Sequence, residues 1–325
     1  MPQRELVEVN MKSRGRGDAT PRSRSQRRQD QARQGAQDIP EARGQRRKVF
    51  SQNLLHDKSA IRSYLSAVGS PPVPAVEVGA GDGGLTVELA AIVPRLTAVE
   101  LDPVFAQALR RRTSDLGNVE VLEHDILTMP QPDGDFVLLG NIPFAITARI
   151  VTWALESPRL QSATLITQRE YARKRTGDYG RWSLTTVRTW PWWDWRLGAR
   201  IDRDSFRPRP SVDAAVLHLI RRPEPLLPYG SQERWGRVVE TGFTGKGGSL
   251  HSSLATIFPR RLVTTAFNRA AVPHDRVVAF VSPYEWLSIF ATLEQQYIDK
   301  EDPRLTAVTR PGRAPREPAR RWGTS

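Results

Sequence analysis

From residue 73 onward, the chain alternates short runs rich in β-branched residues with stretches that have the apolar period of a helix. Six runs are predicted as strands: 73–78, 96–100, 119–123, 135–140, 163–168 and 212–220. Helical patterns such as 85–91 and 103–112 lie between the early runs. Strand and helix in alternation at this spacing predict an α/β fold with a doubly wound sheet, whose ligands bind at the carboxyl ends of the strands.

A proline-rich stretch, residues 223–229, ends this alternation. Beyond it, four segments have helical patterns: 235–243, 250–257, 260–270 and 284–293. We therefore expect a sheet domain over residues 49–222, followed by a small helical domain over residues 223–298.

Positive charge is concentrated at the two ends of the chain. The 325 residues include 48 Lys and Arg and 35 Asp and Glu; residues 1–48 hold 13 and 6 of these, and residues 299–325 hold 7 and 4. Both ends are rich in Arg, Gln, Pro, Gly and Ser and poor in apolar residues, which predicts disordered basic tails. Such tails are either inert or act as flexible arms that bind polyanions.

Several classes of protein are excluded by what the sequence lacks. The chain has no cysteine, which excludes disulfide scaffolds, thiolate metal sites and cysteine nucleophiles. Its five histidines, at positions 56, 124, 218, 251 and 274, have no metal-ligand spacing, so we expect no metal site. There is no run of about 18 apolar residues and no apolar signal segment, so we expect a cytoplasmic protein without a membrane span.

The first predicted strand leads directly into a glycine-rich turn at residues 79–84, and a helix follows. Glycines let such a turn bring its backbone N–H groups against a ligand at the start of a helix. Gly79, Gly81 and Gly84 satisfy the dinucleotide pattern G-x-G-x-x-G, and Glu100 lies about where a ribose-binding acid is expected. A nicotinamide dehydrogenase and a purely structural turn are therefore alternatives.

Two carboxylates follow neighbouring strands beside this turn. Glu100 closes the second strand, and Asp125 follows the third. One carboxylate can accept hydrogen bonds from the hydroxyls of a ribose and the other from an adenine amino group, so the pair suits an adenosyl ligand. Residues 49–158 hold 7 basic and 13 acidic residues, which favours a cationic sulfonium over the pyrophosphate of NAD. Either acid could instead cap a helix.

The fourth strand is followed by the tetrad Asn141-Ile142-Pro143-Phe144. Proline stiffens the turn, the Asn141 side chain offers a carbonyl acceptor, and the Phe144 ring can stack on a planar base. An adenine amino group is a poor nucleophile, so hydrogen bonds that orient it toward a methyl donor would supply most of the catalysis through proximity. The tetrad therefore favours methyl transfer to a base, although the same residues could form an ordinary loop.

Six short motifs occur in a fixed order between residues 48 and 293. They are QNLL at 52–55, EVGAG at 77–81, ELD at 100–102, DIL at 125–127, NIPF at 141–144 and FRPRPSV at 206–212. In this order they resemble the motifs of the erythromycin-resistance (Erm) 23S ribosomal RNA adenine N(6)-methyltransferases, relatives of the small-subunit rRNA adenine dimethyltransferases. The stretch 172–183 resembles the large-subunit branch more than the small-subunit one, and the Arg-rich tails resemble those of versions from actinomycete antibiotic producers.

The resemblance implies a Rossmann-like, class I S-adenosylmethionine-dependent methyltransferase sheet with a small C-terminal helical domain that binds rRNA. It implies that Glu100 holds the ribose of S-adenosylmethionine and that Asp125 holds its adenine ring. The whole cofactor pocket that it implies is formed by Asn53, Leu55, Gly79, Gly81, Glu100, Asp125 and Asn141.

A second pocket, for the target base, is implied by the same resemblance. Phe144 stacks on the flipped adenine, Phe206 closes the opposite face, and Asn141 lies between the cofactor and the base. The amino group would be held by the Asn141 side-chain oxygen and by a backbone carbonyl near Ile142 or Pro143. Because the base must leave its stack, the RNA should be locally single-stranded or loosened. The family commonly has Tyr where Phe144 stands, and the missing hydroxyl leaves the number of methyl groups open.

Residues 159–222 hold 14 basic and 6 acidic residues. The alternatives for this segment are a solvated face and a surface whose phosphate contacts converge on the base pocket. The tryptophans at 190, 192, 193 and 195 are predicted to pack in the core rather than to stack on RNA. The cations predicted to contact rRNA are Arg173, Lys174, Arg175, Arg181, Arg207 and Arg209.

The resemblance implies an enzyme that methylates N(6) of one adenosine of 23S rRNA at the macrolide site. Its product would give resistance to macrolides, lincosamides and streptogramin B, because the added bulk blocks the drugs. We expect it to act as a monomer. A small-subunit (16S) rRNA adenine dimethyltransferase and a catalytically inactive rRNA-binding assembly factor stay as alternatives.

Overall fold

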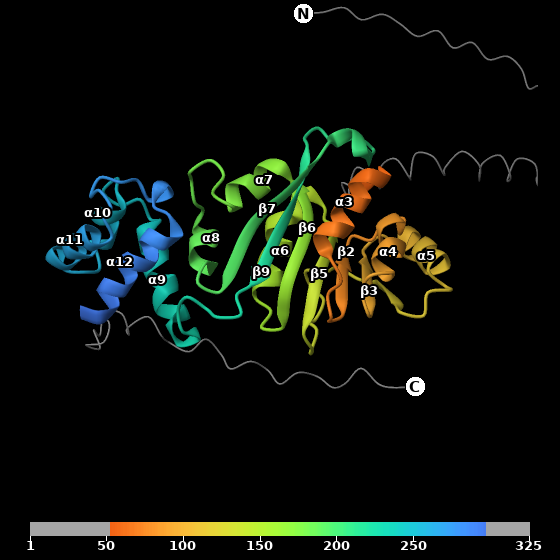
Figure 1. Cartoon of the computed structure of the whole chain (residues 1–325), viewed down its shortest axis with the longest axis horizontal. Helices are drawn as coiled ribbons and strands as arrows, with labels where there is room; N and C mark the ends of the chain where they lie inside the picture. Colours follow the sequence, from red (N-terminus) through yellow and green to blue (C-terminus); the bar gives the residue numbers. More distant parts are fainter. Residues whose placement is uncertain (1–52, 297–325) are drawn as a thin grey trace, which may run out of the picture. The chain divides into compact units, whose positions relative to one another are not determined.

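The computed structural model describes residues 53–296. A seven-stranded sheet, in the order β4-β3-β2-β5-β6-β9-β7, lies at the centre of residues 53–222 (Figure 1). The strands are β2 (Ala75–Val78), β3 (Leu96–Glu100), β4 (Val119–Glu123), β5 (Phe136–Asn141), β6 (Leu160–Gln168), β7 (Trp193–Ile201) and β9 (Ala214–Arg221). Strands β2 to β6 pair in parallel, whereas β9 is antiparallel to both β6 and β7. The predicted α/β doubly wound sheet is confirmed, with one reversed strand near an edge.

The chain changes direction across the sheet at β2. From β2 it moves outward to β3 and β4, and it then returns to β5 on the other side of β2. Ligands of open α/β sheets bind at the carboxyl ends of strands where the order reverses in this way. The residues that follow β2 and β5 are therefore the place to look for a site.

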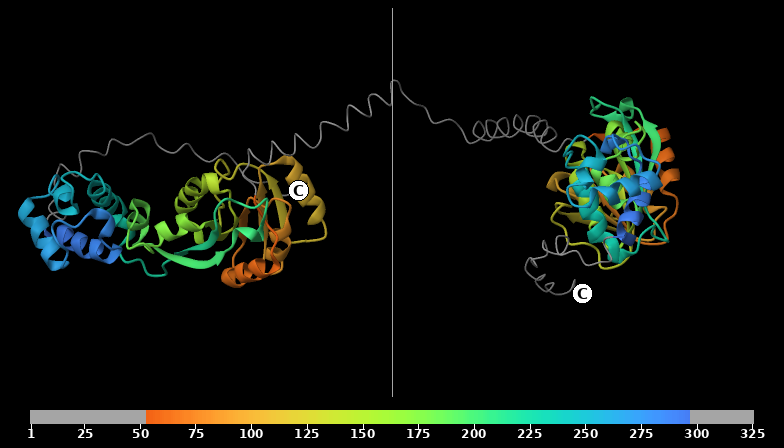
Figure 2. Two further views of the ribbon diagram at one scale, coloured as in Figure 1. Left: turned by 90° about the horizontal axis from the view of Figure 1, so that it is seen from above. Right: turned by 90° about the vertical axis from the view of Figure 1, so that its left-hand side faces the viewer.

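Both faces of the sheet are covered by helices. Leu138 and Leu165 pack in a cluster that includes residues of α6 (Thr147–Leu155) and α7 (Arg169–Arg175). Their neighbours Leu139 and Ile166 pack in a second cluster, with α3 (Lys58–Val68) and α4 (Gly84–Ala90). Figure 2 shows α3 and the green helices on opposite sides of the sheet. Because both faces are buried, the strands have nearly continuous apolar runs instead of alternation.

One helix and a small two-stranded sheet accompany the large sheet. Helix α3 begins after Asp57, whose side chain accepts a hydrogen bond from the backbone N–H of Ala60 at 2.7 Å. Strand β1 (Leu54–Leu55) pairs with β8 (Phe206–Arg207) in a separate two-stranded sheet. The strand pattern predicts none of these three elements. The remaining helices here are α5 (Pro103–Arg112) and α8 (Leu184–Thr189).

Four helices follow the sheet, at the positions that the sequence predicts. They are α9 (Gln232–Gly242), α10 (Leu250–Leu254), α11 (Arg260–Arg269) and α12 (Pro283–Gln296). The division into two domains at residue 222 stays a prediction, and the two predicted tails lie outside the described residues. No helix within residues 53–296 is long and apolar enough to span a membrane.

The tryptophan-rich segment connects the sheet with these helices. Trp190, Trp192, Trp193 and Trp195 are only 4–7% exposed and share one apolar cluster with Trp235 of α9. The indole N–H of Trp235 donates to the Arg188 carbonyl at 2.8 Å. The prediction that these four residues pack in the core is confirmed.

Candidate active site

The turn after β2 is shaped by glycines. Gly79, Gly81 and Gly83 have positive φ angles of 70°, 57° and 79°, a region that residues with a side chain rarely adopt. A Cβ atom on Gly81 would lie 2.7 Å from the Leu54 side chain, so the turn packs tightly against β1. The turn therefore has both the backbone and the close packing that the glycine pattern predicts.

Glu100, at the end of β3, holds this turn in place. Its carboxylate accepts hydrogen bonds from the backbone N–H groups of Gly81 and Asp102, each at 2.8 Å. The side chain is buried, and this burial raises its pKa. The structure thus brings Glu100 and the glycine turn together as predicted, while its contact with a ribose stays a prediction.

Asp125 lies after β4, the strand next to β3. Its Oδ1 accepts from the Leu127 N–H at 2.9 Å and closes a turn over residues 125–128. A local turn role is therefore present in the structure. The proposed second role, toward an adenine ring, stays a prediction.

Glu77 is a buried acid that the prediction of individual site residues missed. It is 1% exposed at the end of β2, and its Oε2 has no hydrogen-bond partner among the described residues. Burial raises its pKa to about 7, and repulsion from Glu100 and Asp82 adds to the effect. An acid within the apolar run AVEV, directly before the glycine turn, was the signal available in the sequence.

The tetrad lies directly opposite the glycine turn. The Asn141 Nδ2 donates to the backbone carbonyl of Asn53 at 2.6 Å, which directs the amide oxygen away from that partner. A Cβ atom on Gly79 would lie 3.5 Å from both the Asn141 carbonyl oxygen and the Pro143 ring. The turn after β2 thus lies beside the end of β5, and Asn53, Gly79, Asn141 and Pro143 are brought together as predicted.

Tyr64 of α3 positions the end of β5 and was also missed. Its hydroxyl accepts from the Gly140 N–H at 2.8 Å and donates to the Thr164 carbonyl at 2.7 Å, and the side chain is fully buried. Gly140 precedes Asn141, so the hydroxyl supports the backbone on which the tetrad is built. A tyrosine among apolar residues at helical spacing, in IRSYLSAV, was the only signal for it.

The predicted residues of the base pocket differ in exposure. Phe144 is half-buried and packs against the apolar cluster that contains Leu55 and Phe206. Leu55 and Phe206 are opposite each other in the β1–β8 pair and are 7% and 2% exposed. The structure therefore places the three residues in one cluster, whereas contact of Phe206 with a base stays a prediction.

Arg173, Arg175 and Arg181 have partners within the protein. Arg173 forms an ion pair with Asp178, and the Arg175 guanidinium donates to the Ser183 hydroxyl at 2.7 Å. The Arg181 guanidinium lies 5.2 Å from the centre of the Phe280 ring. Arg175 is thus held internally, a structural role that the charge count could not reveal.

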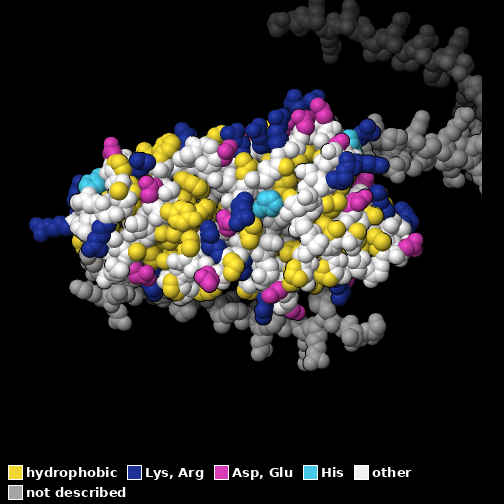
Figure 3. All heavy atoms as spheres, in the orientation of Figure 1, with side chains coloured by type: hydrophobic (Ala, Val, Ile, Leu, Met, Phe, Trp, Pro, Cys, Tyr) yellow, Lys and Arg dark blue, Asp and Glu magenta, His cyan; other side chains and the backbone are white. Residues whose placement is uncertain are grey.

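The other three predicted cations lie on exposed positions. Lys174 and Arg207 are exposed, and Arg209 forms an ion pair with Asp204 at 2.5 Å. Figure 3 shows Lys and Arg side chains gathered along the upper edge, over α7 and the loop that precedes β9. Contact of all six cations with RNA stays a prediction.

Comparisons with known proteins agree with this arrangement. The family model described as ribosomal RNA adenine dimethylase matches residues 43–295. A relative named rRNA methyltransferase, from Streptomyces thermotolerans, is 49% identical over 249 residues, which cover 76% of this chain and 83% of the relative. A relative named rRNA adenine N-6-methyltransferase, from Saccharopolyspora erythraea, is 44% identical over 263 residues, or 81% and 68% of the two chains.

Among solved structures, the 23S rRNA methyltransferase ErmE is 45% identical and superposes with a TM-score of 0.71. The similarity covers 75% of this chain and all of that chain. The sheet order, the contact between the glycine turn and the tetrad, and these matches lead to one conclusion. The chain belongs to the ribosomal RNA adenine dimethylase family.

Proposed function

We propose that this protein transfers a methyl group from S-adenosylmethionine to the exocyclic N(6) of one adenosine in 23S rRNA. The relatives named above support the reaction and the class of RNA. The modified base would lie at the macrolide site, where the added bulk would exclude macrolides, lincosamides and streptogramin B. Because the proposed substrate is ribosomal RNA, we propose that the protein acts in the cytoplasm, and we propose that it acts as a monomer.

The residues at this edge of the sheet fit S-adenosylmethionine. Gly79 and Gly81 give the turn a backbone that a ligand can approach closely. The acidic side chains of Glu77, Asp82 and Glu100 cluster beside it, and one Glu77 oxygen is buried without a described partner. A cationic ligand would favour the ionised form of these acids, so the cluster suits a sulfonium. When bound, S-adenosylmethionine supplies an electrophilic methyl group on its sulfonium. The residues proposed to hold it are Asn53, Leu55, Gly79, Gly81, Glu100, Asp125 and Asn141.

Asn141 carries the proposal for the chemical step. Because its Nδ2 is engaged by the Asn53 carbonyl, its Oδ1 can accept one hydrogen of an adenine amino group. The Pro143 carbonyl already accepts from the Ile146 N–H at 3.2 Å, so we assign the second hydrogen to the Ile142 carbonyl. With both hydrogens of the amino group held by these two acceptors, the nitrogen lone pair would point toward the methyl group. This orientation would supply most of the rate enhancement of methyl transfer. The methylated nitrogen is acidic and loses its proton to water without a strong base.

Phe144 and Phe206 are proposed to enclose the base. Phe144 begins a short 3-10 helix directly after Pro143 and is half-buried, so its ring can contact a flipped base. Phe206 supports the opposite wall from within the apolar cluster.

The proposal is tested by incubating the protein with tritiated S-adenosylmethionine and protein-free 23S or 16S rRNA, followed by mass spectrometry of the nucleosides. We expect label in 23S rRNA as N(6)-methylated adenosine, and the spectrum counts the methyl groups. Label only in 16S rRNA would assign the protein to the small-subunit enzymes instead. Tight rRNA binding without label in either RNA would indicate an inactive assembly factor.

A further inference from the structure

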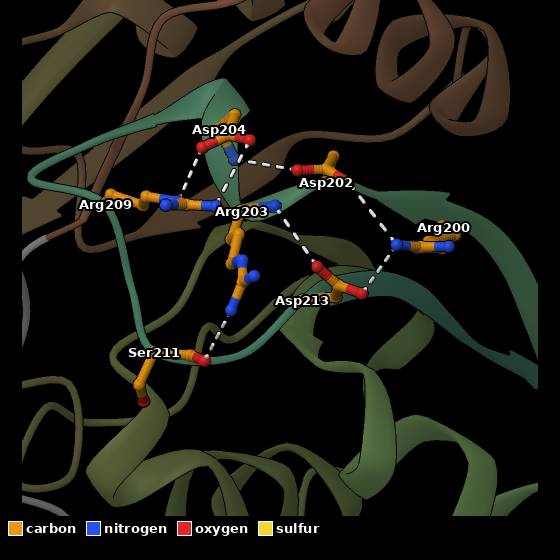
Figure 4. A network of polar contacts seen from close by, with 7 residues as sticks. All are labelled: Arg200, Asp202, Arg203, Asp204, Arg209, Ser211 and Asp213. Atoms are coloured by element: carbon orange, nitrogen blue, oxygen red, sulfur yellow. Dashed lines mark hydrogen bonds and ion pairs between the residues drawn. The ribbon is translucent and has the colours of Figure 1, made fainter.

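The loop between β7 and β9 contains a cluster of paired charges (Figure 4). Arg200 lies 2.8 Å from Asp213 and 3.4 Å from Asp202, and Arg209 lies 2.5 Å from Asp204. Here we call the following residues the arginine–aspartate loop: Arg200, Asp202, Arg203, Asp204, Arg209 and Asp213. They line, with Val212, an open hollow of about 350 Å³.

This loop lies at the rim of the candidate active site. The β8 strand within the loop pairs with β1, and Arg207 is opposite Leu54. The neighbour of Leu54, Asn53, accepts the hydrogen bond from Asn141. On the other side, the Asp213 carbonyl accepts from the Arg169 N–H at 2.9 Å, which joins the loop to the start of α7. The loop is thus linked through β1 to Asn53, the hydrogen-bond partner of Asn141, and through Arg169 to α7.

The carboxylates of the loop hold its arginines but do not neutralise them. Residues 200–213 contain four arginines and three aspartates, so the segment keeps a net charge of +1. Arg209 and Asp204 are both more than half exposed, at 54% and 67% of their side chains. Exposed ion pairs of this kind are weak and screened by solvent. A phosphate group offers the same bidentate geometry to a guanidinium, so it can replace the carboxylate.

We propose that the arginine–aspartate loop is a binding site for an RNA phosphate next to the target adenosine, and that Asp204 competes with this phosphate for Arg209. The inference rests on the proposed function, since it needs an RNA substrate at Asn141. Asp204 then lowers the affinity for every RNA by the same factor, and the contacts at the base pocket discriminate between RNA strands. Asp204 thus weakens phosphate binding in general, whereas Arg209 strengthens it.

The test measures binding of fluorescein-labelled RNA by anisotropy over a range of salt concentrations. Two RNAs are compared: an rRNA fragment that contains the unmodified target adenosine, and an unrelated hairpin of equal length. The variants are Asp204→Asn, Arg209→Gln and the double variant. Asp133→Asn is the matched control, because Asp133 is also exposed but precedes β5, away from the arginine–aspartate loop in the sequence and outside its ion pairs.

We expect Asp204→Asn to tighten binding of both RNAs by about twofold to fivefold, the range that an exposed ion pair is worth. Arg209→Gln should weaken binding and reduce the slope of log K against log salt by about 0.7, the value for one phosphate of a single strand. In the Arg209→Gln background, Asp204→Asn should have no effect beyond that of Asp133→Asn. This comparison separates the effect of the Asp204–Arg209 ion pair on RNA affinity from the effect of removing one negative charge anywhere on the surface.

An equal gain from Asp204→Asn with and without Arg209 would overturn the proposal, as would equal gains from Asp204→Asn and Asp133→Asn. These measurements do not depend on methyl transfer. Absence of label in the rRNA experiment overturns the proposed function. If the rRNA is labelled but Asp204→Asn changes RNA affinity equally with and without Arg209, only the role of the loop is overturned.

Discussion

At the scale of single residues, the site depends on which hydrogen-bond partners are already taken. The Asn141 amide has one partner, the Asn53 carbonyl, and this contact fixes which atom of the amide is available to a substrate. Glu100, by contrast, uses both carboxylate oxygens to hold backbone N–H groups. Asn141 is therefore arranged to act on a substrate, and Glu100 is arranged first to hold the glycine turn.

The Phe144 ring is the residue whose replacement separates RNA recognition from cofactor binding. Phe144→Ala should lower kcat/KM for RNA by about 5- to 150-fold, since stacking on one base is worth about 1–3 kcal/mol. Binding of S-adenosylmethionine, measured by calorimetry, should stay unchanged. Phe144→Tyr keeps the ring and serves as the control; it also shows whether the hydroxyl changes the number of methyl groups. An equal reduction of cofactor binding in Phe144→Ala would contradict the stacking role.

Glu77 makes the stability of the protein depend on pH. Its pKa is raised from an ordinary 4.5 to about 7, so the folded state binds more protons than the unfolded state between these values. The free energy of unfolding should therefore fall as pH rises from 4.5 to 7, by about 3 kcal/mol from this group, and then level off. Urea unfolding at several pH values measures the change.

The matching variant, Glu77→Gln, has no carboxyl to titrate and should lose less stability over the same pH range. Glu88→Gln removes an exposed acid from α4 and should follow the unsubstituted protein. Identical pH profiles for all three proteins would show that folding does not raise the Glu77 pKa, against our assignment.

At the scale of helices and strands, the sequence predicted the elements whose signal is local. Strands β3 and β4 and helix α5 have the predicted bounds, because their β-branched runs and helical spacing are unambiguous. Strands β1 and β8 have two residues each, too short for a periodic pattern, and they exist only because they pair with each other. The reversed direction of β9 depends on pairing with β6 and β7, which no local pattern records.

The same distinction applies to the site. Asn141 and the glycine turn were predicted because they follow strands directly. Tyr64 was missed because its partners, Gly140 and Thr164, are far from it in the sequence. Internal partners of Arg173 and Arg175 were missed for the same reason, since a count of charges does not show which ones are paired.

Helix α3 supports the end of β5 through one hydroxyl, that of Tyr64. Tyr64→Phe would leave the buried Gly140 N–H without its acceptor, which should cost about 1–3 kcal/mol of stability. It should also lower kcat more than it changes RNA affinity, because it disturbs the strand end that carries Asn141. The comparison variant is Tyr284→Phe, which removes a hydroxyl from a side chain that is 61% exposed. Equal stability of the two variants would refute the bridging role.

At the scale of the whole molecule, charge is divided between the parts of the chain. Residues 49–158, which carry the proposed cofactor pocket, are acidic by 13 to 7, whereas residues 159–222, which carry the arginine–aspartate loop, are basic by 14 to 6. A cationic cofactor and an anionic RNA are each attracted to a different part of one site. If the basic ends of the chain bind RNA, this attraction does not depend on the RNA sequence.

Removal of residues 1–48 takes away 13 basic and 6 acidic residues. If this segment binds RNA, the slope of log K against log salt should fall by about 0.7 for each phosphate that the segment neutralises. Removal of residues 299–325, with 7 basic and 4 acidic residues, should have a smaller effect. Filter binding across a salt series measures both, and an unchanged slope after the first truncation would exclude the arm.

The β1–β8 pair joins residues that the ribosome synthesises at very different times. Leu54 and Leu55 are made early, but Phe206 and Arg207 follow only after most of the sheet. A nascent or shortened chain can therefore form its first strands and still lack a finished substrate pocket. The β1–β8 pair can form only after synthesis has reached residue 207 of 325.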